Sequence, residues 1–195
     1  MQLVHQQAVG QMEKLFSELG GMKRDAALEI GCGDCLVSKD LLEKHFAQID
    51  LLDQCQEAVK EMRSYQGRCE RVRHLFHMPM QDLDTQLKYN CIVLRYCIGY
   101  LDDEQAARFL RKLGAMLCQE TQKARAASSS SFIIIQDQVI PDGVEEYTSQ
   151  DQRLRKWSSF QRIIKAAGLA IFKKSALEEL NSRVWPVTAM ALTPT

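Results

Sequence analysis

The sequence predicts a single α/β domain whose seven-stranded, mostly parallel sheet carries helices on both faces. Two observations carry this prediction. From residue 26 to residue 169, short apolar runs alternate with longer segments whose apolar residues recur at helical spacing. A glycine turn at residues 31–33 joins the first apolar run to the next helical segment. Such alternation is typical of βαβ units, which build parallel sheets, and no repeat or composition break divides residues 1–195.

In the first half of the chain, apolar residues at helical spacing predict a helix within residues 1–20, which Gly20 and Gly21 end. The strands that follow are short and apolar, because a strand buried on both faces needs no polar alternation. We expect strands at residues 26–30, 49–53, 74–76 and 91–94, and helices at residues 36–47 and 56–65.

In the second half, Asp102 is a suitable N-cap for a helix whose apolar residues, from Phe109 to Leu117, share one face. Residues 123–131 are low in complexity and are expected to form a flexible loop. The remaining predicted elements are a buried strand at residues 132–135, a helix at residues 151–167 that ends at Gly168, and strands at residues 169–172 and 183–192.

Composition places the chain among globular proteins and excludes several functional classes. Hydrophobic residues make up 46% of the chain, and 25 basic residues balance 25 acidic ones. A chain without excess positive charge is not expected to bind nucleic acid through its phosphates. No apolar run reaches the roughly 20 residues of a membrane span, and the N-terminus lacks the pattern of a secretory signal.

The seven cysteines are scattered, several of them within apolar runs, as is usual for reduced cysteines. We therefore expect a cytoplasmic or nuclear protein. Cys32 and Cys35 have no second pair and no histidine at metal-ligand spacing, so no metal site is expected.

The residues from Leu28 to Asp34 combine a strand end, a glycine turn and a helix start. Gly31 and Gly33 let a ligand approach the backbone closely, and the free N–H groups at a helix start attract negative charge. Asp53 ends the next predicted strand, 20 residues after Gly33. A carboxylate in that place accepts hydrogen bonds from both hydroxyls of a ribose. The alternative is that Asp53 caps the helix that follows it.

The glycine turn lacks one feature of a dinucleotide-binding turn. Leu36 stands where a third glycine would allow close packing of helix and strand beside a pyrophosphate. The turn therefore favours a nucleoside ligand without a pyrophosphate, such as S-adenosylmethionine.

From Leu28 onward the chain resembles class I S-adenosylmethionine-dependent methyltransferases, and more closely the protein N-terminal (α-amine) methyltransferases. The matching segments are residues 28–36, 52–53, 80–83, 95–103 and 161–169. The segments at 95–103 and 161–169 are the more specific to this family, whereas the glycine turn is shared across the superfamily. The resemblance implies a Rossmann-like class I methyltransferase fold with S-adenosyl-L-methionine as its cofactor.

For the cofactor side, the resemblance implies that the two glycines lie under the methionine moiety, that Asp53 holds the ribose and that Met80 and Gln81 flank the adenine. The expected cofactor-binding residues are Gly31, Gly33, Asp53, Gln54, Met80, Gln81 and Arg95. The family's arginine that pairs with the cofactor carboxylate is Leu36 in this chain. Arg95 either supplies the missing cation or is a surface arginine.

For the acceptor side, the family's Lys-Asp-Asn after the fifth strand reads Gln136-Asp137-Gln138. The resemblance thus implies Asp137 and Gln138 as catalytic residues, with solvation of a strand end as the alternative for Asp137. Tyr96 and Tyr100 are expected to bind the substrate, although aromatic residues at such spacing also serve in packing.

Two further departures from the family concern the acceptor. Acidic positions in the segment after the fifth strand are occupied by Tyr147 and Gln150, and a histidine after the fourth strand is replaced by Tyr100.

The resemblance implies a methyltransferase that acts on an amine, either at a protein N-terminus or on another acceptor. An α-amine has a pKa of about 7.7–8.0, so alignment of the reactants can carry most of the rate acceleration. Because the acceptor side departs from the family, two alternatives stay open. They are a non-catalytic interaction module that keeps the fold, and a methyltransferase with a small-molecule or different protein acceptor. The sequence leaves the oligomeric state undetermined.

Overall fold

The structure, a computed structural model, describes residues 2–118, 131–148, 152–176 and 186–195. The loop predicted at residues 123–131 therefore lies, apart from Ser131, outside the described residues. Two compact units make up the chain. The glycine-loop unit comprises Gly20–Arg95 and Met116–Ile133, and the C-terminal unit comprises Met1–Leu19, Tyr96–Ala115 and Ile134–Thr195. That residues 1–195 form one domain stays a prediction.

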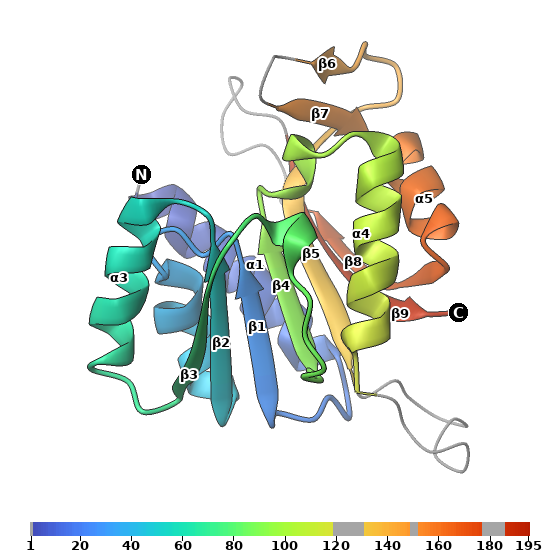
Figure 1. Ribbon diagram of the computed structural model, residues 1–195. Helices are drawn as coiled ribbons and strands as arrows, with labels where there is room; N and C mark the ends of the chain where they lie inside the picture. The colour runs from blue at the N-terminus through green and yellow to red at the C-terminus, as the bar shows by residue number, and fades with distance from the viewer. Residues whose placement is uncertain (1, 119–130, 149–151, 177–185) are drawn as a thin grey trace. The chain divides into compact units, whose positions relative to one another are not determined.

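The glycine-loop unit is built on parallel strands in the order β3-β2-β1-β4. Their bounds are β1 (Ala26–Ile30), β2 (Gln48–Asp53), β3 (Val72–His77) and β4 (Cys91–Arg95). All of β1 and most of β4 are buried, which explains why these segments are apolar apart from Glu29 and the terminal Arg95. Figure 1 shows the strands in blue to green, with helix α3 (Gln56–Gln66) packed against β2 and β3.

The connection between β1 and β2, predicted as a helix at residues 36–47, is helical from Leu36 to His45. A π-helical turn, η1 (Ser38–Leu42), leads into the short helix α2 (Glu43–His45). A single 3₁₀ turn, η2 (Met80–Asp82), follows β3.

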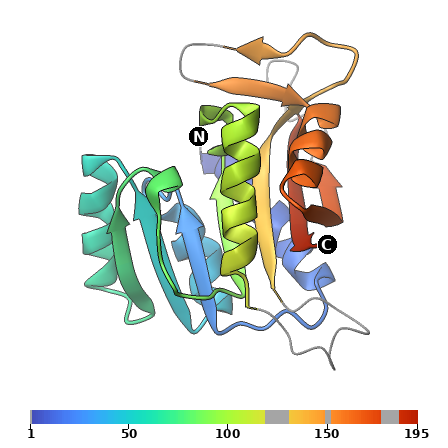
Figure 2. The ribbon, with the colours of Figure 1, turned by 45° about the vertical axis from the view of Figure 1, so that its right-hand side comes forward.

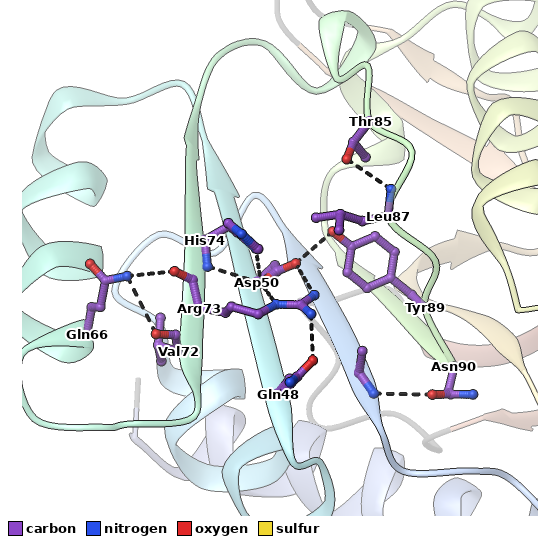
Figure 3. Close-up of polar contacts among 11 residues, drawn as sticks. Gln48, Asp50, Gln66, Val72, Arg73, His74, Thr85, Leu87, Tyr89 and Asn90 are labelled. Carbon is purple, nitrogen blue, oxygen red and sulfur yellow. Dashed lines mark hydrogen bonds and ion pairs between the residues drawn. The ribbon is translucent and has the colours of Figure 1, made fainter.

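A buried carboxylate, Asp50 of β2, joins neighbouring strands in this unit (Figure 3). Arg73 of β3 donates to it twice, from Nε to Oδ1 at 3.0 Å and from Nη2 to Oδ2 at 2.7 Å. The backbone N–H of His74 and the hydroxyl of Tyr89 add bonds of 3.0 and 2.8 Å. Burial opposes ionisation of Asp50, but the bonds from Arg73 and Tyr89 outweigh it and hold its pKa below the ordinary value.

Strand β5 (Phe132–Ile140) begins in the glycine-loop unit, where the N–H of Phe132 donates to Asn90 O at 2.9 Å, and continues in the C-terminal unit. In the C-terminal unit β5 pairs with β9 (Val187–Pro194), which in turn pairs antiparallel with β8 (Leu169–Ala176). The two strands predicted at residues 169–172 and 183–192 are therefore confirmed, with residues 183–185 outside the described residues, and they pair antiparallel with each other.

The helix predicted at residues 151–167 begins later than expected. Residues Arg153–Lys156 form strand β7, which pairs in parallel with the end of β5, and helix α5 spans Trp157–Ala166. The prediction was wrong for 153–156 because Arg155 looks like a solvent-facing helix residue, whereas its guanidinium is 1% exposed and finds its partners within the fold. Strand β6 (Tyr147–Thr148) pairs antiparallel with β7, and Figure 2 shows this hairpin at the carboxyl end of β5.

The other helices of the C-terminal unit are α1 (Gln2–Glu18), α4 (Asp103–Met116) and the 3₁₀ turn η3 (Ile98–Tyr100). The predicted cap of α4 is confirmed: Asp102 Oδ1 accepts the N–H of Gln105 at 2.7 Å. The Gln105 side chain accepts the N–H of Asp102 at 3.0 Å in return, which is a reciprocal capping box.

The strand order β3-β2-β1-β4-β5, with mostly parallel pairing and the antiparallel β8-β9 pair, confirms the predicted α/β fold. The seven predicted strands are present, and β6 and β7 are additional. Within the described part of the chain, no helix is long and apolar enough to cross a membrane.

Candidate active site

The glycine turn after β1 is held in a conformation that requires glycine. Gly31 and Gly33 have φ angles of 68° and 53°, in the left-handed region. The N–H groups of Gly31 and Cys32 both donate to Leu52 O of β2, at 2.8 and 3.2 Å. A Cβ atom built on Gly33 would meet no atom within 4 Å. The turn is thus hydrogen-bonded to β2 on one side, and the space next to the Cα of Gly33 is open.

Asp53, at the end of β2, links this turn to the helix that follows. Its Oδ2 accepts the N–H of Gly33 at 2.9 Å, and its Oδ1 accepts the N–H of Cys55 at 2.8 Å. Cys55 is the N-cap residue of α3 and makes no side-chain capping bond, and Asp53 bonds to Cys55 rather than to a backbone N–H inside the helix. Asp53 therefore orders the residue before α3 and does not cap the helix. A carboxylate offers about four acceptor sites, so two remain for ribose hydroxyls.

Glu29, next to the glycine turn, is a buried carboxyl that the sequence did not single out. It is 3% exposed in β1, and its Oε2 accepts the backbone N–H of Ser38 at 3.0 Å as well as the Ser38 hydroxyl. Burial raises its pKa to about 7, although both bonds from Ser38 and the charge of Arg95 act in the opposite direction. A lone glutamate inside an apolar strand is the signal that could have marked it. Arg95 is half-buried, and its charge is one of the influences that lower the pKa of Glu29. Its contact with the cofactor stays a prediction.

The remaining cofactor candidates lie after β2 and β3. The backbone O of Gln54 is 3.2 Å from His77 Nε2, and the Gln54 side chain is exposed. Met80 is half-buried and Gln81 exposed in η2. Their contact with an adenine stays a prediction.

The residues around the glycine turn fit S-adenosylmethionine. The space above Gly33 is open, and the Asp53 carboxylate keeps free acceptor capacity for a ribose. The family's arginine is replaced by Leu36. Two positive charges act near the turn: Lys39 Nζ donates to Asp34 O at 2.7 Å, and Arg95 acts electrostatically on Glu29.

Asp137, in the C-terminal unit, is a buried carboxyl on β5. It is 3% exposed; Oδ1 accepts the N–H of Gln138 at 2.8 Å, and Oδ2 is buried with no hydrogen-bond partner among the described residues. Burial raises its pKa to about 7, while the bond from Gln138 and the positive charge of Arg155 act in the opposite direction. A carboxyl with a pKa near neutrality can take up and release a proton at physiological pH.

The neighbours of Asp137 on β5 serve other roles. Successive side chains of an extended strand point to opposite faces, so Gln136 and Gln138 do not share a face with Asp137. Gln136 Nε2 donates to Ala8 O at 2.9 Å and to Gln11 Oε1 at 2.8 Å, both on α1. Gln138 contributes to Asp137 through its backbone N–H.

The two predicted substrate tyrosines follow β4. Tyr96 has a φ of 54°, unusual for a residue with a side chain, and its N–H donates to Gln136 O at 2.9 Å. Tyr100 ends η3 and is 62% exposed, so packing does not account for its side chain. Their substrate role stays a prediction.

Two acidic residues near Tyr147 and Gln150, the positions that differ from the family, bond to the backbone at the start of α5. Glu146 Oε1 accepts the N–H of Lys156 at 2.9 Å, and Asp142 Oδ1 accepts the N–H of Ser158 at 3.0 Å. Tyr147, at one departure, is 59% exposed. Gln150, at the other, lies outside the described residues.

Metal-ligating side chains do not gather in the described ranges: no group of three or more His, Cys, Asp or Glu there could hold a metal ion. All seven cysteines, Cys32 and Cys35 included, carry free thiols.

Similarity to known proteins is consistent across sequence and fold. A family model described as AdoMet dependent proline di-methyltransferase matches residues 7–193. The chain is 29% identical, over 168 residues, to N-terminal Xaa-Pro-Lys N-methyltransferase 1 of Danio rerio, covering 85% of this chain and 71% of that protein. It is 22% identical, over 186 residues, to alpha N-terminal protein methyltransferase 1 of Arabidopsis thaliana, covering 93% and 64%.

Among solved structures, the fold is similar to that of a SAM-dependent methyltransferase from Leishmania major. The TM-score is 0.83 at 20% identity, over 99% of this chain and 74% of that one. An S-adenosylmethionine-dependent methyltransferase from Clostridium acetobutylicum gives a TM-score of 0.74 at 12% identity, over 98% and 92%.

Proposed function

Because the chain belongs to the family of AdoMet-dependent proline di-methyltransferases, we propose that Asp137 serves as the base that prepares an α-amine for methylation. The enzyme is an S-adenosylmethionine-dependent methyltransferase of the protein N-terminal type. The observation that carries the role of Asp137 is its buried, unpartnered Oδ2 together with its raised pKa of about 7.

The chemistry asks for one proton acceptor. An N-terminal amine is largely protonated below its pKa of about 7.7–8.0, and only the neutral amine has the lone pair that forms the new N–C bond. Asp137 Oδ2 takes the N–H proton, and Oδ1 stays bound to Gln138 N–H, which keeps the carboxylate oriented. The cofactor, when bound, supplies an electrophilic methyl group on a sulfonium sulfur. The close match between a base of pKa about 7 and this amine allows the transfer near neutral pH.

The residues that hold the cofactor in this proposal are those of the glycine turn and the end of β2. Gly31 and Gly33 let the methionine moiety approach the backbone, and Asp53 accepts the ribose hydroxyls. Gln54, Met80 and Gln81 lie in the segments that would flank the adenine.

The acceptor of this proposal is the N-terminus of a protein beginning Xaa-Pro-Lys, as the names of the vertebrate relatives state for them. Tyr96 and Tyr100 would contact it, and the chain's neutral charge balance supports a protein rather than a nucleic acid partner. The free thiols of all seven cysteines support a reducing compartment, the cytoplasm or nucleus.

The test of this function uses the purified full chain, S-adenosylmethionine and a peptide beginning Ala-Pro-Lys. We expect successive methyl additions on the N-terminal nitrogen, detected by mass spectrometry, and none on the same peptide with an acetylated N-terminus. Methylation of the acetylated peptide would move the acceptor elsewhere. Cofactor binding without turnover of any free N-terminus would favour a different acceptor, and no binding at millimolar cofactor would favour a non-catalytic module.

The proposed role of Asp53 in cofactor binding is tested separately, by calorimetry with S-adenosylhomocysteine. Asp53→Ala should weaken binding roughly thirtyfold to a hundredfold, the loss for hydrogen bonds to a charged group. Asp53→Asn, which keeps one acceptor oxygen, is the matched control and should lose less. Equal affinity in all three proteins would leave Asp53 only the structural role of bonding the backbone of Gly33 and Cys55.

A further inference from the structure

Arg155 of β7 is the most completely buried cation of the C-terminal unit's described residues, at 1% exposure. Its three nitrogens are all used. Nε donates to Asp103 Oδ1 at 2.9 Å, Nη1 donates to Ile98 O at 3.0 Å, and Nη2 donates to Leu101 O. One guanidinium therefore holds both ends of the turn that contains Tyr100 and also pairs with the start of α4.

The strand register places Arg155 on the same face of the sheet as Asp137. Arg155 pairs with Val139 in the parallel β5-β7 ladder, and paired residues of parallel strands point to the same face. Asp137 lies two residues before Val139, so it shares that face. The electrostatic influence of Arg155 on Asp137 agrees with this geometry.

The turn and β7 are packed backbone to backbone at Gly99. A Cβ atom at Gly99 would lie 3.0 Å from Arg153 O and 3.1 Å from the Gln152 side chain. Only glycine fits this approach without a shift of the neighbouring backbone. The guanidinium of Arg155 and the absence of a side chain at Gly99 thus secure the same contact.

We propose that Arg155 is a positioning residue for methyl transfer: it locks the Ile98–Leu101 turn against β7 and holds a positive charge on the face that carries Asp137. This inference rests on the proposed role of Asp137 as the base. The locked turn presents Tyr100 to the acceptor, and the charge keeps Asp137 ionised for more of the time at neutral pH.

The charged groups around this pair are few among the described residues. Asp103 faces Arg155 from α4, Glu146 interacts with it electrostatically from the segment before β6, and Arg155 itself is the charged side chain that acts on Asp137. Removing the charge of Arg155 leaves only the bond from Gln138 to oppose the effect of burial on Asp137, so the pKa of Asp137 rises. Removing the charge of Asp103 leaves Arg155 less neutralised and acts in the opposite direction.

The test compares Arg155→Gln with Asp103→Asn, because a merely structural role would make both variants loosen the same turn with the same effect. The first readout is the titration of the Asp137 carboxyl in protein labelled with ¹³C-aspartate, assigned with Asp137→Asn. We expect Arg155→Gln to raise this pKa by on the order of one unit, and Asp103→Asn to lower it slightly or leave it unchanged. The second readout is the pH dependence of kcat on the Ala-Pro-Lys peptide, which should shift the same way. Affinity for S-adenosylhomocysteine should be unchanged.

Arg155→Lys separates the two parts of the role and covers the case in which Arg155→Gln fails to fold. It keeps the charge but loses the fork that reaches two carbonyls. We expect a wild-type pKa for Asp137 with a kcat reduced roughly tenfold. An unchanged Asp137 pKa in Arg155→Gln, or equal pKa shifts in Arg155→Gln and Asp103→Asn, would overturn the electrostatic part. A wild-type kcat in Arg155→Lys would overturn the positioning part. If the wild-type chain methylates no amine, the proposed function fails, and the titration still decides the electrostatic part of this inference.

Discussion

Two buried aspartates in the two units of this protein have opposite protonation behaviour. Asp50 is fully buried, and its two oxygens accept bonds from Arg73, His74 and Tyr89, so its pKa lies below the ordinary value (Figure 3). Asp137 is almost as buried, yet among the described residues it accepts one backbone bond and its Oδ2 has no hydrogen-bond partner, and its pKa is raised to about 7.

The comparison shows that burial alone does not decide the charge of a carboxyl; the number and charge of its donors do. Glu29 is the intermediate case. It accepts two bonds, but both come from the neutral Ser38, and its pKa still rises to about 7. A direct guanidinium bond is what separates Asp50 from the other two. A carboxyl without such a donor can act as a base, whereas one that has it is a structural anchor.

The largest expected effect is that of Asp137→Asn on methyl transfer. The amide cannot accept the amine proton, so kcat should fall roughly 10²-fold to 10⁴-fold, the usual contribution of a general base. Initial rates on the Ala-Pro-Lys peptide and S-adenosylhomocysteine calorimetry measure this, and cofactor affinity should not change. A kcat within about threefold of wild type, far less than the usual contribution of a general base, would mean that alignment alone carries the reaction.

The next effect is that of Asp50→Asn on stability. The variant removes a charge-assisted pair with Arg73 and should lower the free energy of unfolding by about 2–3 kcal/mol. Urea unfolding measures it, with Asp84→Asn, an exposed aspartate of the same unit, as the control expected within about 0.5 kcal/mol of wild type. If Asp50→Asn lost no more unfolding free energy than the control, Asp50 would not be a structural anchor, and its contrast with Asp137 would fail.

The pH dependence of stability sharpens the same contrast. An ordinary Asp has a pKa of about 3.9 in the unfolded chain, and Asp137 has a folded pKa of about 7. Between these values the folded state holds a proton that the unfolded state has lost, so this group makes stability fall as pH rises. Asp50 has the opposite sign: its stabilisation is present above the unfolded pKa and is lost as pH falls through its lowered folded pKa.

Asp137→Asn should therefore gain stability relative to wild type between about pH 5 and about pH 8, because the amide carries no charge to bury. Asp50→Asn should lose least relative to wild type at the acid end of a series extended to about pH 3. Urea unfolding across the series measures both differences. Parallel curves for Asp137→Asn and wild type would show that Asp137 titrates like an exposed carboxyl.

The smallest expected effect is that of Ser38→Ala. The variant removes the hydroxyl bond to Glu29 but leaves the backbone bond, so the free energy of unfolding should fall by about 1 kcal/mol. The pKa of Glu29 should rise further, since one lowering contribution is lost. Ser64→Ala, at an exposed serine of α3, serves as the control in the same unfolding series. Because Ala raises helix propensity relative to Ser, the control should not lose stability, and an equal loss in the control would show that the bond to Glu29 is not the cause.

Much of the fold could be predicted from local patterns. Buried parallel strands appear as apolar runs, and β1 and β4 are buried along nearly their whole length. The Asp102 cap of α4 was predictable because a capping side chain bonds to a backbone N–H only a few residues away. The glycine turn was predictable because its positive φ angles depend on residues 31 and 33 themselves.

The helix boundary at residue 157 and strand β7 could not be predicted in the same way. Arg155 is charged, and its burial depends on carbonyls at Ile98 and Leu101 that lie more than fifty residues away. No window of sequence around Arg155 contains those partners. The candidate site was predicted in its parts, Asp53 and Asp137, but their hydrogen bonds and the opposite facing of Gln138 were not.

The sequence by itself determined the α/β fold, the glycine turn, the cofactor class and the identity of the acidic residues available for catalysis. Only the tertiary structure decided which acid is an anchor and which can be a base, because a carboxyl's proton affinity depends on the donors that distant segments bring to it. Asp50 accepts hydrogen bonds from Arg73 of the neighbouring strand, whereas Asp137 accepts a hydrogen bond from the backbone N–H of Gln138. The residue type is the same at both positions, and the long-range contacts make the difference.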